Sequence, residues 1–408
     1  MKFLILSQYY PPETGAPQNR LHSLSLNLVK NGCDVEVLTA MPNYPKMEIF
    51  EDYKGLSYKE EIIDGIKVHR SKIYVSKSKG VPKRLLNYFS YVFTSIRVLN
   101  KLSKPDYVIC ESPPLFLGIS ALYISRKLEA KLIFNVSDLW PESAEKLNIV
   151  NNKFILNLAY LLEKYIYKKS FLVTGQTQGI ISNINRRFPK IPTLWLPNGI
   201  DKEVYEVTEN KDWINEYGLY GKSIYVYAGI VGHAQALDVI IKAKSWLLKN
   251  EFELSKKVAF VIIGDGPDKQ RLVALNKQLQ TKIIFIPNTP KTELLKMLKA
   301  CHVYIVPLKK IDLFLGAIPS KIFDALALSK PILLGVAGEA KSLFIDQGNA
   351  GIYFEPENEK ALAKAIIKLE NDQLKSKEFS FSGNKFALKN FDREIIAKKL
   401  LIKIKELN

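Results

Sequence analysis

Hydrophobic runs of strand length alternate with helix-length segments along almost the whole chain. Near the N-terminus, the apolar run Phe3–Leu6 is followed by a polar loop over 7–15, a helical pattern over 16–30 and a second apolar run over 35–39. This order predicts a β-strand, an α-helix and a parallel β-strand. Further short apolar runs, separated by helix-length segments, occur at 107–110, 132–136 and 171–174. The first part of the chain is therefore predicted to contain one parallel sheet.

The same pattern starts again after position 197. Strand-like runs, each followed by a helix-length segment, are "SIYVYAG", "VAFVIIGDG", "KIIFIP", "HVYIVP" and "PILLGV". We therefore expect an α/β protein with two Rossmann-like domains, residues 1–190 and 191–385, which face each other across a cleft lined by helix N-termini. Apolar residues at helical spacing over 386–408 predict a terminal amphipathic helix that packs back on the first domain.

Length and charge agree with this organisation and favour an anionic partner. The 408 residues fit two domains, and 47% hydrophobic residues indicate globular cores. Lys and Arg number 59 against 41 Asp and Glu, a net charge of +18. No helix-turn-helix, zinc-finger, RRM or KH signature is present, so we do not expect nucleic acid to be that partner.

Cysteine and histidine usage indicates neither disulfides nor a metal site. The three cysteines are far apart in the sequence, and no two of the four histidines have metal-ligand spacing. No apolar run approaches the roughly 18 residues that span a bilayer, and the first residues lack the pattern of a signal peptide. We therefore expect a cytoplasmic protein without a bound metal.

The segment "PSKIFD" places three polar residues at the start of an otherwise apolar helix. Ser320 is predicted to cap this helix, and the ammonium of Lys321 together with the helix dipole favours a diphosphate. Asp324 lies on the same face, where its carboxylate can accept hydrogen bonds from ribose hydroxyls. The alternative is an ordinary capped helix with a solvated Lys and a solvated Asp.

Glycines follow two other strands of the second half. Gly229 and Gly232 precede a helix expected to begin near Gln235, and Gly264 and Gly266 precede a helix expected to begin near 267. Each pair allows backbone to approach a ligand closely, although each is also compatible with a tight turn. Neither loop matches the GxGxxG or GxxxxGK[ST] fingerprint of dinucleotide or Walker sites.

The first half offers fewer candidates at its strand ends. Gly15, a further candidate for ligand binding, occupies the turn after the first strand, and Arg20 follows about one turn into the helix. Ser137 and Asp138 come directly after a buried strand. Arg20 could instead be a surface residue, and Asp138 could instead cap the next helix.

The segment 77–104 combines basic and aromatic residues and contains no acid. Its basic and aromatic residues are Lys77, Lys79, Lys83, Arg84, Tyr88, Phe89, Tyr91, Phe93, Arg97, Lys101 and Lys104. Such a stretch is typical of a surface that lies on an anionic membrane. The alternative is a core helix whose aromatic side chains pack on the sheet while its basic side is solvated.

Motifs in both halves occur in the order found in one known family. They are "YYPPETGAPQNR", "MPNYP", "NVSDLWPESA", "LPNGID", "AGIVGHAQALD", "IIGDGP", "AIPSKIFDALALSKPIL" and "GEAKSLF". The chain resembles the bacterial family 4 glycosyltransferases of the GT-B fold, and within them the WbuB-like branch that adds N-acetylated deoxyamino sugars during O-antigen and capsule assembly. The resemblance covers nearly the whole chain.

This resemblance implies a retaining, metal-independent hexosyltransferase. The second domain would bind a nucleotide-sugar donor, with uridine as the base, and would need no further cofactor. The first domain would bind a polyprenyl-diphosphate-linked saccharide acceptor, with Arg20, Ser137 and Asp138 on the acceptor side. The protein would then work as a peripheral protein on the inner face of the cytoplasmic membrane.

The resemblance also assigns roles to single residues. Asp324 matches the second acid of the family's Glu-x7-Glu pair, but Gly316 occupies the position of the first, for which Asp312 is a candidate substitute. Ile230 and Gln235 stand where many relatives carry an Arg and a Lys.

Lys321 therefore becomes the main candidate for stabilising charge on the leaving diphosphate. Asp138 becomes the candidate that orients or deprotonates the acceptor hydroxyl, unless a β-phosphate oxygen of the donor is the base.

Two other functions share the expected donor site. A nucleotide-sugar epimerase of GT-B fold would need no acceptor and no membrane. A non-catalytic sugar-nucleotide-binding partner would bind without turnover, as the missing first acid suggests. Analysis of the reaction products distinguishes all three.

Overall fold

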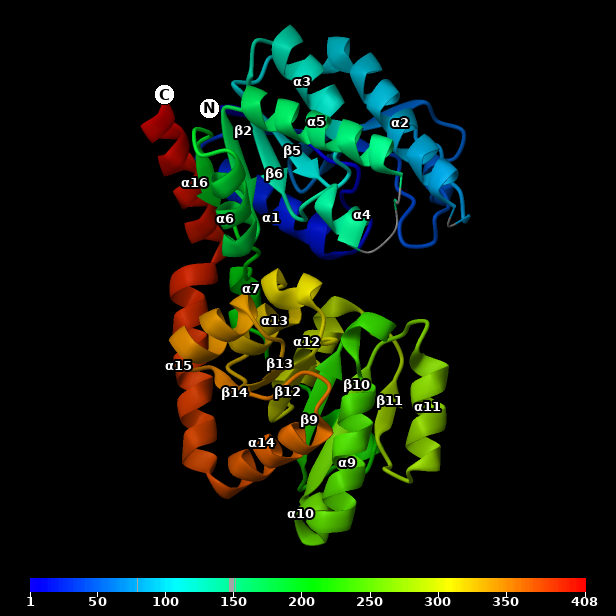
Figure 1. Ribbon diagram of the computed structural model, residues 1–408, viewed down its shortest axis with the longest axis vertical. Coiled ribbons are helices and arrows are strands. Elements are labelled where there is room, and N and C mark those ends of the chain that lie inside the picture. The colour runs from blue at the N-terminus through cyan, green and yellow to red at the C-terminus, as the bar shows by residue number, and fades with distance from the viewer. Residues whose placement is uncertain (79, 147–149, 151) are drawn as a thin grey trace. The chain divides into compact units, whose positions relative to one another are not determined.

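The chain divides into two units (Figure 1). The structure, a computed structural model, describes residues 1–78, 80–146, 150 and 152–408. The first unit comprises Met1–Asn198 and Arg393–Asn408, and the second comprises Gly199–Asp392. The boundary lies after Asn198 and not after 190, because strand β8 at 193–195 pairs with β7 and so completes the first sheet.

The first unit contains one sheet and the helices that cover it. Its strands are β1 (Lys2–Leu6), β2 (Asp34–Ala40), β3 (Tyr58–Ile63), β4 (Ile66–Ser71), β5 (Tyr107–Ser112), β6 (Lys131–Val136), β7 (Leu172–Gly175) and β8 (Thr193–Trp195). Its helices are α1 (Ala16–Lys30), α2 (Val81–Arg97), α3 (Leu117–Lys127), α4 (Glu142–Lys146), α5 (Lys153–Lys169), α6 (Gln178–Arg187) and α16 (Arg393–Leu407).

The strand order of the first sheet is β3-β4-β2-β1-β5-β6-β7-β8. The strands run parallel except β3, which pairs antiparallel with β4. The chain leaves β1 in one direction along the sheet and later returns to add β5 on its other side, so the order reverses between these two strands. Ligands of open α/β sheets bind beside the carboxyl ends of the strands at such a switch point.

Both faces of this sheet are buried, as the near-continuous apolar strands predict. Phe3 and Ile5 of β1 pack with α1 and α16, whereas Leu4 and Leu6 face the core formed with α2, α3 and α5. Figure 1 shows these helices on the two sides of the sheet. Alternation of side chains along each strand therefore fixes which helices lie on which face.

The second unit repeats this architecture. Its strands are β9 (Ser223–Ala228), β10 (Val258–Ile263), β11 (Ile284–Ile286), β12 (Val303–Pro307), β13 (Ile332–Gly335) and β14 (Gly351–Tyr353). Its helices are α7 (Lys202–Tyr205), α8 (Asp212–Glu216), α9 (Asp238–Asn250), α10 (Phe252–Lys257), α11 (Lys269–Gln278), α12 (Lys291–Lys299), α13 (Lys321–Ala327), α14 (Glu359–Asn371) and α15 (Gln373–Phe391).

The second sheet has the parallel order β11-β10-β9-β12-β13-β14. Its order reverses between β9 and β12, so the loops after these two strands mark the expected ligand edge. Helices α9 and α14 pack together and contribute to the buried core of this unit. Each unit thus has its own Rossmann-like sheet with its own switch point.

The C-terminal segment differs from the prediction of a single helix over 386–408. The chain is helical in α15 up to Phe391, becomes extended at Asp392 and is helical again in α16. Backbone of Asp392 forms an isolated β-bridge with Ile200 within the second unit. The amphipathic part is therefore α16, whose Ile396, Leu400 and Ile404 lie in the core of the first unit.

The basic aromatic segment 77–104 is largely helix α2, and Lys79 lies outside the described residues. Tyr91 is buried in the core, whereas Phe93 is exposed. Lys83, Arg84 and Arg97 are exposed as well. The interpretation as a core helix is therefore confirmed for Tyr91. The membrane surface stays a prediction. In the described part of the chain, no helix has the length and apolar character needed to cross a membrane.

Candidate active site

Lys321 lies at the carboxyl-end edge of the second sheet. It is the first residue of α13, and its Nζ donates a hydrogen bond to Oη of Tyr227 at 3.0 Å. The same ammonium stands 4.2 Å from the centre of the Tyr227 ring, a cation–π contact. The Tyr227 hydroxyl in turn donates to the carbonyl of Ile230 at 2.6 Å. Strand β9 and the loop after it thus fix the position of this ammonium.

The surroundings of Lys321 make its charge costly in the free protein. Burial lowers the pKa of Lys321 to about 8, and the negative charge of Asp324 opposes this effect in part. An ammonium held in place and poorly solvated gains more from an incoming anion than one in water does. Lys321 and Asp324 therefore lie close enough on α13 for their charges to interact. That they bind a nucleotide stays a prediction.

Ser320 does not cap α13. Its backbone has φ −60° and ψ −25°, which is the helical region, and its side chain makes no capping hydrogen bond. Capping requires an extended residue whose hydroxyl faces the free N–H groups of the first turn. Because the chain already turns helically at Ser320, its exposed side chain lies outside that geometry.

The glycines after β9 and β10 are required for packing between loops. A Cβ atom at Gly264 would lie 2.0 Å from the carbonyl oxygen of Gly229, and one at Gly266 would lie 2.3 Å from that of Val231. Backbone hydrogen bonds join the same loops, including one of 2.9 Å from the Val231 N–H to the carbonyl of Asp265. Gly264 and Gly266 were predicted as ligand-contacting positions, but close contact between the two loops is sufficient to explain both.

Gly229 differs from these two because it faces Lys321. Its φ is +136°, and a Cβ atom there would lie 3.4 Å from both Cε and Nζ of Lys321. Gly229 therefore leaves room beside the ammonium as well as adopting a conformation that other residues rarely reach.

Gly232 and Gln235 form a short turn before the next helix. Residues His233–Gln235 make a 3-10 turn, Ala236 is left-handed with φ 47°, and α9 begins at Asp238. The helix predicted to begin near Gln235 thus starts three residues later. A Cβ atom at Gly232 would lie 2.9 Å from Oε1 of Gln235, so these two positions are in contact.

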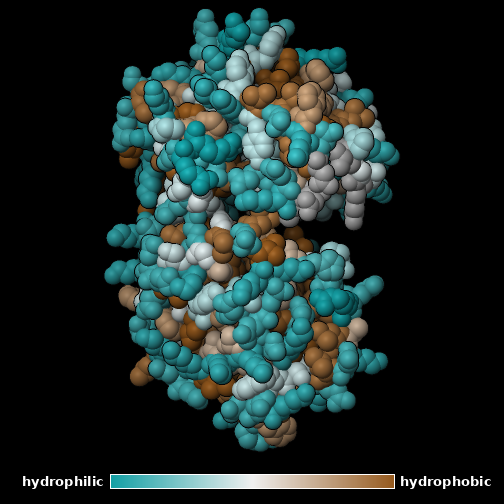
Figure 2. Space-filling model, in the orientation of Figure 1, coloured by the Kyte–Doolittle hydropathy of each residue, from teal (hydrophilic) through white to brown (hydrophobic). Residues whose placement is uncertain are grey.

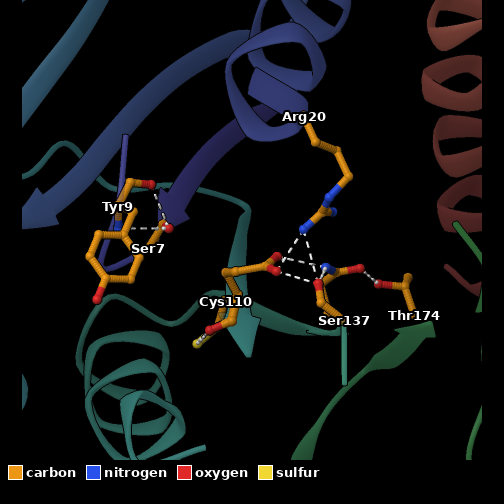
Figure 3. Close-up of polar contacts among 8 residues, drawn as sticks. Ser7, Tyr9, Arg20, Cys110, Ser137 and Thr174 are labelled. Atoms are coloured by element: carbon orange, nitrogen blue, oxygen red, sulfur yellow. Dashed lines mark hydrogen bonds and ion pairs between the residues drawn. The ribbon is translucent and has the colours of Figure 1, made fainter. Parts of the chain in front are cut away.

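In the first unit, Arg20 and Ser137 belong to one buried network (Figure 3). Nη2 of Arg20 lies 2.6 Å from Oε1 of Glu111 and 3.0 Å from Oγ of Ser137, which also donates to Glu111. The side chains of Arg20 and Glu111 are 6% and 4% exposed. A buried charge persists only when it is paired, and here α1 and β5 supply the pair.

The network continues across the sheet to β7. Nδ2 of Asn135 donates to Glu111 at 2.6 Å, and the hydroxyl of Thr174 donates to Oδ1 of Asn135 at 2.7 Å. Sequence reasoning found Arg20 and Ser137 but missed Glu111, their common partner. The available signal was an acid near the end of the apolar strand "YVICES", where a charge needs a partner.

Asp138 and Gly15 lie at the same edge of the first sheet. Asp138 is exposed, and its Oδ1 accepts a hydrogen bond of 2.5 Å from Ser143 at the start of α4. Gly15 precedes α1 with φ 170°, which is extended backbone open to any residue. Its site is restricted instead by Gln18, whose Oε1 would lie 2.4 Å from an added Cβ atom.

Glu13, which the sequence analysis missed, joins the loops after β1 and β2. Its carboxylate accepts backbone N–H groups of Asn43 and Tyr44 at 2.8 Å each, and of Tyr10 at 3.2 Å. Burial raises the pKa of Glu13 to about 7, and these hydrogen bonds oppose the rise. Glu13 therefore fixes the shape of the loop that leads to Gly15.

Two family profiles match consecutive parts of the chain. The profile described as "Glycosyl transferase 4-like domain" matches residues 15–199, and the one described as "Glycosyl transferases group 1" matches residues 209–386. Together they span both units and most of the sequence. The chain belongs to the family 4 glycosyltransferases.

Similar proteins agree with this membership. The glycosyltransferase is 24% identical over 383 residues to the putative colanic acid biosynthesis glycosyl transferase WcaI of Escherichia coli K12, covering 90% of this chain and 91% of that protein. The solved sucrose-phosphate synthase of Thermosynechococcus elongatus superposes with a TM-score of 0.73 at 13% identity, over 100% of this chain and 99% of that one. HepE of Anabaena in complex with UDP-glucose gives 0.71 at 15% identity over the whole of both chains. These likenesses establish the GT-B fold.

Free space surrounds Gly316, the position that the resemblance assigned to the first acid of the Glu-x7-Glu pair. Gly316 ends the 3-10 turn Asp312–Gly316, and nothing lies within 4 Å of a Cβ atom built there. Asp312, the candidate substitute, is exposed at the start of the same turn. Gly338 holds this turn against the loop after β13, since its φ is +75° and an added Cβ atom would lie 2.1 Å from the carbonyl oxygen of Leu315.

Proposed function

We propose that this glycosyltransferase moves a sugar from a UDP-linked donor to a lipid-linked saccharide, with retention of configuration and without a bound metal, in bacterial polysaccharide biosynthesis. The N-acetylated deoxyamino hexose of the WbuB-like branch is the proposed donor sugar. The observation that carries the proposal is the ammonium of Lys321, fixed by Tyr227 at the switch point of the second sheet.

The donor assignment is supported by chemistry and by the relatives. A nucleoside diphosphate needs a cation for its phosphates and an acceptor group for its ribose, and Lys321 and Asp324 provide these one turn apart. HepE, which shares the fold, has been solved with UDP-glucose. WcaI, the relative from Escherichia coli, is described as acting in colanic acid biosynthesis.

The bonds, electrons and protons of the proposed transfer balance without a metal ion. The bond between the sugar C1 and the β-phosphate oxygen breaks, and a bond from C1 to the acceptor oxygen forms on the same face. The electron pair of the broken bond stays on UDP, where Lys321 stabilises the new charge. The hydroxyl proton of the acceptor passes to a β-phosphate oxygen or to Asp138.

The acceptor is proposed to be a saccharide linked to polyprenyl diphosphate. Such a molecule stays in the membrane, so the enzyme would work as a peripheral protein on its cytoplasmic face. The exposed cations Lys83 and Arg84 at the start of α2 support this location, because anionic lipids attract basic surfaces.

Product analysis with a panel of UDP-amino sugars and lipid-linked acceptors tests the reaction. We expect a longer lipid-linked saccharide and free UDP in EDTA, and turnover about 10²-fold or more lower in Lys321→Ala. Lys364→Ala, which removes an exposed lysine of α14, is the matched control and should keep full turnover. Epimerised donor without transfer would identify an epimerase, and donor binding without any product would identify a non-catalytic partner.

A further inference from the structure

Helix α5 exposes hydrophobic side chains along its outer face. Phe154, Leu158, Leu161 and Tyr165 recur at helical spacing and are 72%, 51%, 60% and 55% exposed. The opposite side of the same helix is buried in the core through Leu156, Ala159 and Ile166. A helix on the surface of a soluble domain normally turns a polar face outward, so a second apolar stripe needs an explanation.

The neighbouring helices extend this surface. Helix α3 packs against both α2 and α5, so the three form one layer over the same face of the first sheet. Leu86 and Phe93 of α2 and Tyr123 of α3 are exposed on it. In Figure 2, hydrophobic side chains reach the surface over this layer. Exposed hydrophobic side chains therefore occur on all three helices of this layer.

The charges on this layer are almost all positive. The sequences of α2 and α3 contain no acid, and the acid of α5, Glu163, is buried and paired with Arg187. The exposed cations of the three helices are Lys83, Arg84, Arg97, Arg126, Lys127, Lys153, Lys164, Lys168 and Lys169. An apolar area surrounded by cations complements a bilayer of anionic lipids better than it complements water.

A hollow lies beside the stripe. Its volume is about 410 Å³, and it is lined by Asn157, Tyr160, Leu161, Lys164, Arg187 and Phe188. Tyr160 has an aromatic ring with a polar end, and together with the cation of Lys164 it suits the boundary between headgroups and acyl chains.

We propose that the outer face of α5, which we call the α5 stripe (Phe154, Leu158, Leu161 and Tyr165), enters the surface of an anionic bilayer, with the cations of α2, α3 and α5 on the lipid headgroups. This surface lies on a different helix from segment 77–104. The proposal rests on the proposed function only because a lipid-linked acceptor would require the enzyme to bind the membrane.

The stripe begins close to the candidate acceptor residues. In a parallel sheet, a helix that follows a strand runs back from the carboxyl edge, so the N-terminal end of α5 lies near the end of β6. Tyr160 of α5 donates a hydrogen bond of 2.6 Å to Glu145 of α4, the helix that follows Asp138. A bilayer bound to the α5 stripe would therefore bring its lipids close to the carboxyl edge of the first sheet, where Asp138 lies.

Vesicle co-sedimentation tests the proposal. We expect the wild-type protein to bind vesicles of phosphatidylcholine with phosphatidylglycerol more tightly than phosphatidylcholine alone. Leu158→Asp/Leu161→Asp should bind the anionic vesicles about tenfold or more weakly, because two exposed apolar side chains become charged. Lys164→Glu/Lys168→Glu should weaken binding to the anionic vesicles in the same direction.

The matched control is Leu374→Asp/Phe381→Asp on α15, which changes two exposed hydrophobic side chains of the second unit. It should bind vesicles as the wild type does. Circular dichroism and thermal unfolding should be unchanged in all these variants, since the replaced side chains lie at the surface.

Three results would overturn the proposal. The first is that Leu158→Asp/Leu161→Asp binds the vesicles as tightly as the wild type does, and the second is that the wild type does not bind them. The third is that the wild type binds no vesicles but self-associates, and that this variant abolishes the self-association. That third result would assign the α5 stripe to a second copy of the chain. UDP titration keeps the two proposals apart, because the residues proposed for UDP lie in the second unit. Absence of UDP binding by the wild type would contradict the proposed function and leave the membrane proposal unaffected.

Discussion

At the scale of single residues, the environment of Lys321 determines what it can do. Burial holds its pKa near 8, while Tyr227 fixes its ammonium by a hydrogen bond and a ring contact. The residue is therefore partly neutral in the free protein just above physiological pH. A bound diphosphate would favour the charged form, since an opposite charge raises the pKa of an amine.

This shift predicts a pH dependence of UDP binding. Because only the ammonium attracts the diphosphate, affinity should change little between about pH 7 and the pKa of about 8, and should fall as pH rises above it. Below about pH 7 the terminal phosphate of UDP itself begins to take up a proton. At pH 8, binding should take up about half a proton, which calorimetry in buffers of different ionisation enthalpy measures.

Lys321→Arg is the control, because an arginine stays charged over this range. Its affinity for UDP, whatever its value, should not change between about pH 7 and pH 9. A wild-type affinity that is equally flat would show that Lys321 does not titrate in this range.

Single residues also show where sequence reasoning stops. The spacing of Lys321 and Asp324 on one helix was visible in the sequence, and both lie where it placed them. The pairing of Arg20 with Glu111 could not be predicted from the sequence, because these residues are far apart in the chain and meet only when α1 packs against β5. Arg20 thus has a protein partner that no local pattern reveals.

At the scale of elements, contact between the loops after β9 and β10 shapes the edge of the second sheet. Gly264→Ala should lower the free energy of unfolding of the second unit by about 2–4 kcal/mol, because its φ is +141° and the added methyl would overlap the Gly229 carbonyl. Gly316→Ala is the control and should stay within about 0.5 kcal/mol of the wild type, since its surroundings are open. Urea unfolding measures both, and equal stability of the two variants would refute the packing role.

Most elements that build the two sheets could be predicted because their strands are apolar on both faces and their helices are amphipathic. The break between α15 and α16 could not. Asp392 is neither Gly nor Pro, and its extended conformation depends on a bridge to Ile200, far away in the sequence. Strand β8 was missed for a related reason, since its pairing with β7 and not its composition makes it part of the first sheet.

At the scale of the whole molecule, the two units share one architecture but carry different side chains at the carboxyl ends of their strands. Each sheet has its own switch point. The edge of the first sheet carries the buried ion pair of Arg20 and Glu111, whereas the edge of the second carries the ammonium of Lys321 beside Gly229. The net charge of +18 is in turn concentrated partly on the layer formed by α2, α3 and α5. Donor binding by the second unit is the central claim, because the proposed transfer depends on it.

Calorimetric titration with UDP in EDTA, with GDP and NAD as comparisons, tests that claim most directly. Our account predicts saturable binding of UDP with a micromolar to millimolar Kd, no comparable binding of GDP or NAD, and about tenfold or more weaker UDP binding by Lys321→Ala. Absence of UDP binding by the wild type, or equal binding by Lys321→Ala, would contradict it.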